Sequence, residues 1–281
     1  MGCRRKRHFA EIKMENISKF TFSAIGNIES TAKYRYELPR QSVFSASSAF
    51  LRWNKKIYSE CAADLHGFDR IWLIWVFDRN EKSNFRTKAR VPVPADKDTY
   101  SVFATRSPYR PNPIGISAVE LLEITPEGLL LGACDLLDGT AVLDIKPYIP
   151  EADAFPDAKA GWRDNIDKNK NEIIWSDTAA KQADFILENG NFDLRNFCDV
   201  QLTYRPTDNS RKRVEKCSNS DNYILHFRTW KITFNYAAEK SLVNIIEINS
   251  NYSAADLAPG SSDKYGDKDL HRRFINTMFT I

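Results

Sequence analysis

Apolar and polar positions alternate along most of the chain between Phe20 and Ile149. A repeat of two residues is typical of β-strands. Strands are therefore predicted over residues 20–25, 70–78, 102–105, 117–124, 129–136 and 140–149. The densest run, RIWLIWVFD at 70–78, predicts a central strand buried on both faces. Short strands joined by turns such as Thr125-Pro126-Glu127-Gly128 indicate a closed or sandwich-like all-β unit, with one short helix ending at Gly67.

The pattern changes after about Pro147. Prolines, aspartates and a lysine–asparagine run up to Lys170 predict a linker. Ser176 is a good N-cap for a helix that ends at Gly190, and residues 193–202 predict a second helix. Alternation then returns at 230–234 and 242–248, while 251–281 is polar and predicts no element. This half predicts a small α+β unit, and Trp53, Trp72, Trp75 and Trp230 are predicted to be core residues.

Composition is that of a globular protein, with 42% hydrophobic and 27% charged residues among 281. A net charge of +3 neither requires nor excludes a nucleic-acid partner. The five cysteines are scattered without a CxxC pair, which argues against a metal site and favours the reducing cytoplasm. No apolar run is long enough to span a membrane. The basic start, residues 1–18, predicts a disordered leader without a secretory signal.

The most unusual segment is residues 102–120, VFATRSPYRPNPIGISAVE. Its three closely spaced prolines fix the backbone and remove donors, so the segment predicts a stiff loop. The loop presents Arg106, Ser107, Arg110 and Asn112 in fixed directions. Two guanidinium groups and a hydroxyl suit a phosphate or a carboxylate ligand. A rigid structural connection, with the arginines paired to nearby acids, explains the residues equally well.

A second candidate is the run DLLDGT at 135–140. Asp138-Gly139 is a tight-turn pair, so backbone N–H groups and a carboxylate converge there. A carboxylate would favour a cationic ligand such as a sulfonium. Considered alone, the run is better explained as an ordinary hairpin turn with a capping aspartate.

Four segments together resemble one known family. TRSPYRPNPIGIS, DLLDGTAVLDIKPYIP, ELPRQ at 37–41 and GFDRIWLIWVFD at 67–78 are similar to the signatures of the TsaA/TrmO family. The resemblance implies a mainly β fold: a β-barrel N-terminal domain at 19–155 and a small α+β C-terminal domain at 156–281 that assists tRNA binding. It also implies a homodimeric, S-adenosylmethionine (SAM)-dependent tRNA (adenine-N6)-methyltransferase. The implied substrate is N6-threonylcarbamoyladenosine at position 37, beside the anticodon, which receives a methyl group on N6.

The resemblance carries the SAM contacts onto four segments of this chain. They are Pro39, Arg40 and Gln41; Asp78 and Arg79; Arg106 and Ile116; and Asp135, Asp138, Gly139 and Thr140. Asp78 departs from the family pattern, which has histidine or another polar residue after that strand.

Methyl transfer is an in-line displacement, so aligning donor and acceptor is the protein's main contribution. The acceptor nitrogen is urea-like and weakly nucleophilic, which makes a carboxylate base attractive. Asp138 is the first candidate, followed by Asp135 and Asp144. Lys146 and Tyr148 follow this loop and are candidates for holding the threonyl carboxylate or the RNA backbone. A solvated lysine at a strand end is the alternative for Lys146.

RNA contacts are predicted on further surfaces. Single-stranded anticodon bases can stack on aromatic rings and arginines. The tRNA-binding candidates are Arg110 and Asn112 in the proline loop and Tyr204, Arg205, Arg211 and Arg213 in a basic cluster. The alternative for the cluster is a solvated loop.

Two rival functions remain open at this point. One is a SAM-binding barrel that acts on another RNA or on a small molecule. The other is a non-catalytic RNA-binding module, although the intact proline loop and DLLDGT run argue against a decayed pocket.

Overall fold

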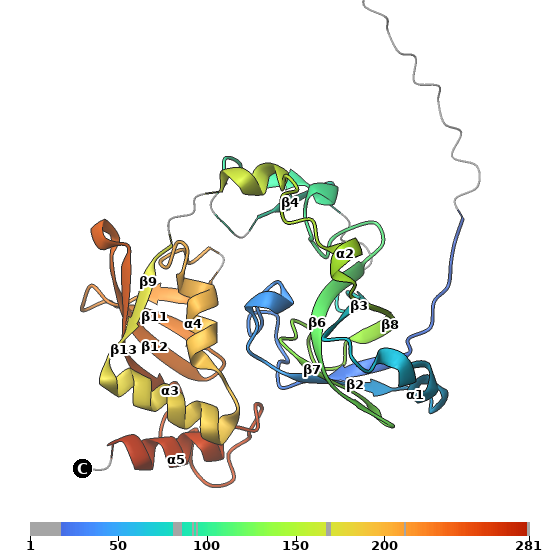
Figure 1. Ribbon diagram of the computed structural model, residues 1–281. Helices are drawn as coiled ribbons and strands as arrows, with labels where there is room; N and C mark the ends of the chain where they lie inside the picture. The colour runs from blue at the N-terminus through green and yellow to red at the C-terminus, as the bar shows by residue number, and fades with distance from the viewer. Residues whose placement is uncertain are drawn as a thin grey trace, which may run out of the picture.

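The structure, a computed structural model, describes residues 18–80, 86–91, 93, 95–166, 170–210 and 212–279. Two bodies are visible in Figure 1, with a smaller arm beside them. The predicted disordered leader lies outside the described residues except for Ser18. Among the helices that are described, none combines the length and apolarity needed to cross a bilayer.

The N-terminal body is a closed six-stranded barrel. Its strands, in order around the barrel, are β1 (Gly26–Glu29), β2 (Ala49–Trp53), β7 (Gly128–Gly132), β6 (Ile114–Thr125), β3 (Arg70–Val76) and β8 (Ala141–Pro147). All neighbours are antiparallel. Leu51, Leu73 and Leu129 fill the interior and are fully buried. The predicted mainly β fold with a barrel is confirmed.

Some predicted strands are wrong or shifted. Residues 20–25 form no strand: Phe20 and Phe22 are exposed, and β1 begins only at Gly26. Residues 102–104 form a 3₁₀ helix, η3 (Val102–Ala104), instead of a strand. The strand at 70–78 exists as β3 but is not buried on both faces. Only Ile71 and Leu73 are buried, because one face of a barrel strand points inward and the other outward.

Strands β6, β7 and β8 lie where the alternation predicts them, with different ends, whereas β2 was not predicted. β6 begins directly after the last proline of the loop, and β7 ends at Gly132 rather than at residue 136. Short helices α1 (Ile57–Cys61) and η2 (Ala63–Leu65) precede Gly67, whose φ of +90° confirms a break there. A further 3₁₀ turn, η1 (Ser42–Phe44), lies between β1 and β2.

An arm carries the strand pair β4 (Lys88–Arg90) and β5 (Thr99–Ser101). The predicted linker packs on it through η4 (Gly161–Asn165): the Trp162 ring stacks on Tyr100 with centroids 4.8 Å apart, and Trp162 Nε1 donates to the Ala104 carbonyl at 2.8 Å. The linker also contains the short helix α2 (Pro150–Asp153). The arm lies at the top of Figure 1.

The C-terminal body is a five-stranded sheet covered by helices. The strand order is β10 (Val214–Lys216), β11 (Tyr223–Phe227), β12 (Trp230–Ala237), β13 (Leu242–Ser250) and β9 (Glu172–Trp175). Helices α3 (Asp177–Gly190) and α4 (Leu194–Leu202) lie where the sequence predicts them, and Ser176 Oγ caps α3 by accepting from Ala179 N at 3.0 Å. Trp230 is fully buried, as predicted.

Helix α5 (Lys268–Phe279) was not predicted. The helix has a highly charged sequence, but one face, made of Leu270, His271 and Phe274, is buried. The helix is amphipathic, but its overall composition is polar and a histidine fills a core position, so the sequence alone indicates a polar segment. Figure 1 shows α5 beside α3, below the sheet.

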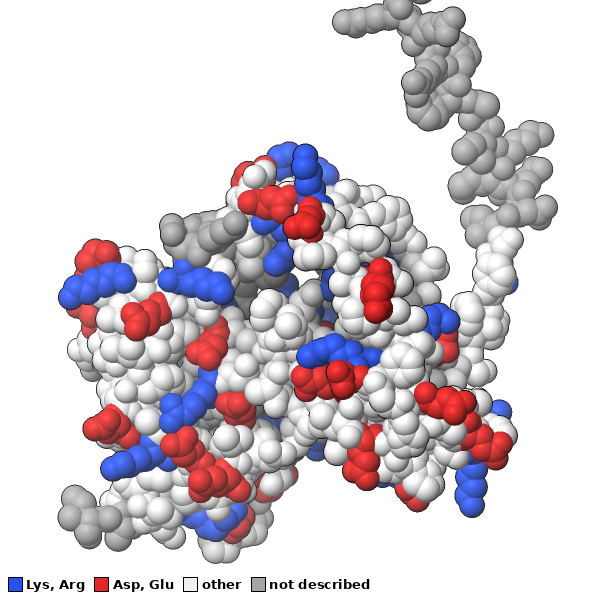
Figure 2. All heavy atoms as spheres, viewed as in Figure 1, with Lys and Arg blue, Asp and Glu red and all other residues white. Residues whose placement is uncertain are grey.

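Charges of both signs are interspersed on the face seen in Figure 2. This agrees with the small net charge of +3. Chemistry in this chain therefore depends on local arrangements of side chains.

Candidate functional site

Four loops meet at one end of the barrel, here called the barrel mouth. Val76, at the end of β3, pairs with Ile114, at the start of β6. Trp75 and Gly26 both pair with Val142, near the start of β8. The mouth is thus formed by the loops after β1, after β3, before β6 and between β7 and β8. These loops contain the segments 39–41, 78–79, 106–113 and 135–140, which the sequence predicts to form one site.

The proline loop is rigid and is connected to the end of β3. Phe77 N donates to the Pro113 carbonyl at 2.8 Å. The Arg110 guanidinium turns back on the loop and donates to the carbonyls of Thr105 (3.1 Å) and Ser107 (3.4 Å). Arg106 instead reaches out of its loop and donates to Gln41 Oε1 at 2.7 Å. The Arg110 side chain thus binds carbonyls of its own loop, whereas Arg106 joins two predicted segments.

The turn at Asp138-Gly139 fastens the loop after β1. Gly139 has a φ of +78°, as the tight turn requires. Asp138 N donates to the Ala32 carbonyl at 2.8 Å, and Asp138 Oδ1 accepts from Ser30 N at 3.1 Å. Arg79 donates to the carbonyls of Asp138 and Lys33, the latter at 3.0 Å. The Asp138 carboxylate thus already has a backbone partner.

Asp135 differs from Asp138. Its Oδ1 is buried and has no hydrogen-bond partner among the described residues. Burial raises the pKa of Asp135, and this is only partly opposed by Ser117, by its own backbone and by the charge of Arg106. Ser117 Oγ in turn accepts from Trp75 Nε1 at 3.1 Å. An orphaned buried carboxylate oxygen is rare and calls for a donor.

Three predicted site residues lie on the outer wall of the barrel. Asp144 and Lys146 face outward on β8 and pair with each other at 3.3 Å, with side chains 53% and 64% exposed. Ile116 is also exposed, whereas its neighbours Gly115 and Ser117 point into the barrel.

Tyr148 lies at the far end of the barrel from the mouth. Its N–H donates to the Arg70 carbonyl at 3.1 Å, and its ring packs on Trp72 with centroids 5.5 Å apart. The sequence placed Tyr148 next to the DLLDGT loop, and the length of β8 separates them.

The remaining predicted residues have varied surroundings. Pro39 and Thr140 are buried, while Arg40, Asp78, Arg79, Asn112 and Gly139 are exposed. Of the basic cluster, Arg213 lies over the Tyr36 ring at 4.8 Å, and Lys212 Nζ donates to the carbonyls of Tyr204 and Arg205. Arg211 lies outside the described residues.

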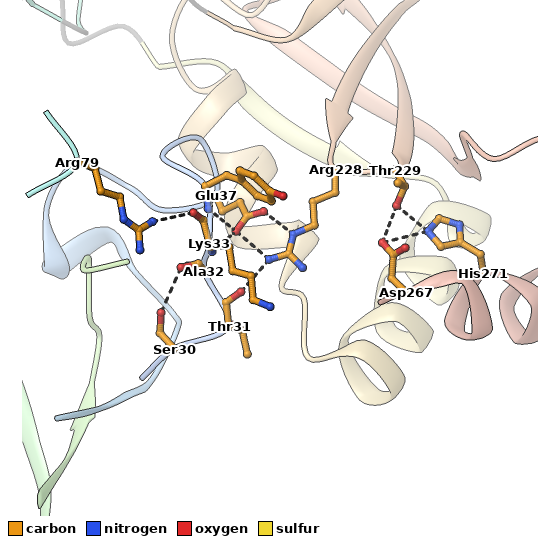
Figure 3. A network of polar contacts seen from close by, with 11 residues as sticks. Ser30, Thr31, Ala32, Lys33, Glu37, Arg79, Arg228, Thr229, Asp267 and His271 are labelled. Atoms are coloured by element: carbon orange, nitrogen blue, oxygen red, sulfur yellow. Dashed lines mark hydrogen bonds and ion pairs between the residues drawn. The ribbon is translucent and has the colours of Figure 1, made fainter. Parts of the chain in front are cut away.

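Arg35 joins the mouth although the sequence did not single it out. Its guanidinium donates to the Arg79 carbonyl at 2.7 Å, to Asn80 Oδ1 at 2.8 Å and to the Tyr109 hydroxyl at 3.4 Å. Glu37 and Arg228 were also missed as a pair (Figure 3). No local pattern pairs two residues so far apart, and only the fold brings them together.

Two surface hollows lie away from the mouth. One is lined by residues 65–68 and 121–124, and the other by Asp69, Arg70 and residues 120–122. Because Arg70 pairs with Glu120 at the opposite end of β3 from Val76, both hollows belong to the other end of the barrel. Within the described ranges, no three His, Cys, Asp or Glu side chains form a metal-binding group.

Comparison with known proteins identifies the family. Residues 27–154 match the model of the tRNA-methyltransferase O N-terminal domain. The chain is 33% identical over 224 residues to the tRNA (adenine(37)-N6)-methyltransferase of Escherichia coli, covering 77% of this chain and 95% of that protein. The chain belongs to the TrmO family. It is also 32% identical over 216 residues to the human tRNA (adenine(37)-N6)-methyltransferase. That alignment covers 74% of this chain and 47% of the human protein.

One solved structure is similar in fold, and one further relative is named for binding SAM. The crystal structure of TrmO from Pseudomonas aeruginosa has a TM-score of 0.59 and 27% identity, covering 83% of this chain and 99% of that one. A protein of Archaeoglobus fulgidus named S-adenosyl-L-methionine-binding protein is 40% identical over 129 residues, 46% of this chain and 89% of that protein.

Proposed function

We propose that this TrmO-family chain is a SAM-dependent tRNA methyltransferase that methylates N6 of adenine 37. The observation that carries the proposal is the buried, unpartnered oxygen of Asp135 at the barrel mouth, near the charge of Arg106. The relative in Escherichia coli, 95% of which this chain covers, is named for that activity.

The residues of the mouth fit SAM by charge. SAM carries a sulfonium, an ammonium and a carboxylate, so its site needs a negative group and a positive group. Asp135 offers a carboxylate oxygen that lacks a donor, and Arg106 offers a guanidinium held by Gln41 at 2.7 Å. The proposed contacts are Pro39, Arg40, Gln41, Asp78, Arg79, Arg106, Ile116, Asp135, Asp138, Gly139 and Thr140. The outward direction of Ile116 gives it the weakest support.

SAM, when bound, supplies the methyl group. The chain has to orient the acceptor and hold the proton that leaves N6. Asp135 suits the role of proton acceptor, because burial raises its pKa and therefore its affinity for a proton. Asp138 ranked first in the sequence, but its carboxylate binds Ser30 N. We therefore propose Asp135 as the base and Asp138 as the residue that holds the loop after β1.

Asp144 and Lys146 receive little support for a catalytic role. They form an exposed pair on the outer wall, where water screens their charges. For Lys146 we keep the other proposed role, in which its ammonium group contacts the RNA backbone from this wall.

We further propose that the acceptor is N6-threonylcarbamoyladenosine in the anticodon loop. Tyr204, Arg205 and Arg213 in the C-terminal body and Arg35 at the mouth supply aromatic and guanidinium groups for unstacked bases and phosphates. A homodimer and a cytoplasmic location complete the proposal, and the free cysteines among the described residues suit a reducing compartment.

Methyl-labelled SAM and two tRNA pools test this function. One pool carries the threonylcarbamoyl modification, and the other comes from cells that cannot make it. Nucleoside mass spectrometry should find label on N6 of the threonylcarbamoylated adenosine and none in the other pool. Label in neither pool, with SAM binding demonstrated, would reject the tRNA acceptor and favour a SAM-binding barrel with another substrate. Without SAM binding, a non-catalytic RNA-binding module would be favoured.

A further inference from the structure

The turn between β11 and β12 reaches the barrel through one arginine. Phe227 pairs with Trp230, so Arg228 and Thr229 alone form the turn. Arg228 has a φ of +49°, a conformation that non-glycine residues adopt at an energetic cost. Its side chain is nonetheless almost fully buried and lies over the ring of Phe192 at 4.5 Å. A strained, buried arginine indicates that its side chain has a function that glycine cannot supply.

The partner of Arg228 is Glu37 in the loop after β1. Arg228 donates from both Nε and a terminal nitrogen to the two Glu37 oxygens, the latter contact measuring 2.9 Å, and the side chains are only 5% and 3% exposed. Burial opposes the positive charge, yet the hydrogen bonds and charge of Glu37 raise the pKa of Arg228 above its usual value. Arg228 also donates to the Thr31 carbonyl at 2.8 Å. These contacts are drawn in Figure 3.

Glu37 in turn folds its own loop. Its Oε2 accepts from the backbone N–H groups of Lys33 at 2.7 Å and Tyr34 at 3.1 Å. Without Arg228, this carboxylate would keep two backbone donors but would be a buried charge without an opposite charge, which is strongly unfavourable. The loop would therefore have to open to bring Glu37 into water.

The same loop forms part of the barrel mouth. Arg79 holds it at Lys33, as Figure 3 shows, and Asp138 holds it at Ser30 and Ala32. Two residues after Glu37 the chain reaches Pro39, and Gln41 then binds Arg106. A displacement at Glu37 is thus passed directly to the segment proposed to contact SAM.

We propose that Arg228 is a positioning residue for the SAM site, through which the C-terminal domain holds segment 39–41 in its binding conformation. This inference rests on the proposed function, because it needs SAM as the ligand of the mouth. It makes the C-terminal domain a part of the cofactor site as well as a surface for RNA.

Calorimetric titration of SAM into the full chain tests the role of Arg228. The variants are Arg228→Gln, which keeps a polar side chain without the charge, and Arg228→Lys, which keeps the charge. Arg195→Gln is the control, since Arg195 lies in the same domain, pairs with Asp184 at 2.9 Å and makes no contact with the loop among the described residues.

Arg228→Gln should weaken SAM binding about tenfold, Arg228→Lys should weaken it less, and the control should bind like wild type. Loss of folded protein alone would lower the binding stoichiometry and leave the dissociation constant unchanged, so that result overturns the inference. Wild-type affinity in Arg228→Gln also overturns it while leaving the proposed function intact. If Arg228→Gln does not fold, wild-type affinity in Arg228→Lys and in Glu37→Gln overturns it. A wild-type chain that does not bind SAM overturns both proposals.

Discussion

Two shielded aspartates, one in each body, have opposite surroundings. Asp267 lies beneath the β11–β12 turn and accepts hydrogen bonds from Thr229 Oγ1 at 2.7 Å and Tyr252 OH at 2.8 Å, with His271 Nε2 at 3.7 Å. Burial raises its pKa, but these partners outweigh burial and leave the pKa lowered. Asp135 has an oxygen without a partner, and burial leaves its pKa raised.

The difference separates a structural network from a binding site. Around Asp267 the fold supplies the donors itself, and His271 is further fixed by Ser250 Oγ at 2.8 Å and by stacking on Trp230 at 3.7 Å. A satisfied network of this kind makes a domain rigid. Around Asp135 the fold supplies donors only in part, through Ser117 and backbone N–H groups, and Oδ1 is left without a partner. Thr229, Asp267 and His271, although they look like a catalytic triad, therefore belong to the core. Asp135 belongs to the proposed site.

The largest expected effect is that of Asp135→Asn on methyl transfer. Loss of the base and of the negative charge should lower the rate by about 100-fold or more, while the chain stays folded because a buried charge without a full set of partners is removed. The labelled-SAM assay measures the rate, with Asp144→Asn on the outer wall as the matched control. Equal rates in the two variants would remove Asp135 from the mechanism.

Asp267→Asn should give the next largest effect, on stability. An amide cannot replace the carboxylate as acceptor for both hydroxyls, so the free energy of unfolding should fall by about 2 to 3 kcal/mol. Urea denaturation of the full chain measures this loss. Asp269→Asn, in the first turn of α5 and with its pair to Arg273 exposed to solvent, is the control. A loss no greater than that of the control would show that the Asp267 network is not a source of rigidity.

The pH dependence of stability should separate the two aspartates by sign. The lowered pKa of Asp267 gives stability that is present above 3.8, the usual value, and is lost as pH falls through the folded-state pKa. The raised pKa of Asp135 gives stability that is present below 3.8 and is lost as pH rises through the folded-state pKa. Asp267→Asn should thus lower the free energy of unfolding most at neutral pH. At the same pH, Asp135→Asn should have its most favourable effect on that free energy. The measurement is the denaturation midpoint of each variant relative to wild type, as a function of pH. The comparison would be contradicted if the two differences changed in the same direction as pH rises.

The smallest effect is expected on the outer wall. Lys146→Ala removes an exposed ion pair with Asp144, which should change stability by no more than about 0.5 kcal/mol. Thermal denaturation measures this change, and the SAM dissociation constant should stay at the wild-type value. A tenfold weaker binding of SAM would instead move the site to this wall.

How far the sequence predicts the molecule depends on whether information is local. Strand alternation and turn residues located most of the barrel, and Ser176 located the start of α3. The sequence failed where tertiary burial decides: Phe20 and Phe22 remain exposed, and α5 buries a histidine.

For the candidate site, the motifs indicated loops that the fold brings together at the barrel mouth, but they did not indicate the surroundings of each side chain. The sequence ranks Asp138 above Asp135 as the base, and only the structure shows that the Asp138 carboxylate accepts from Ser30 N while Asp135 has a buried oxygen without a partner. Arg228 could not be predicted at all, because its partner Glu37 lies 191 positions away in the chain.

The most direct test of the account is a crystal structure of the full chain with S-adenosylhomocysteine, the demethylated product of SAM. The account predicts the ligand at the barrel mouth, with a donor within hydrogen-bond distance of Asp135 and contacts to segment 39–41 and Arg106. A ligand in the hollow lined by residues 65–68 and 121–124, at the other end of the barrel, would contradict it.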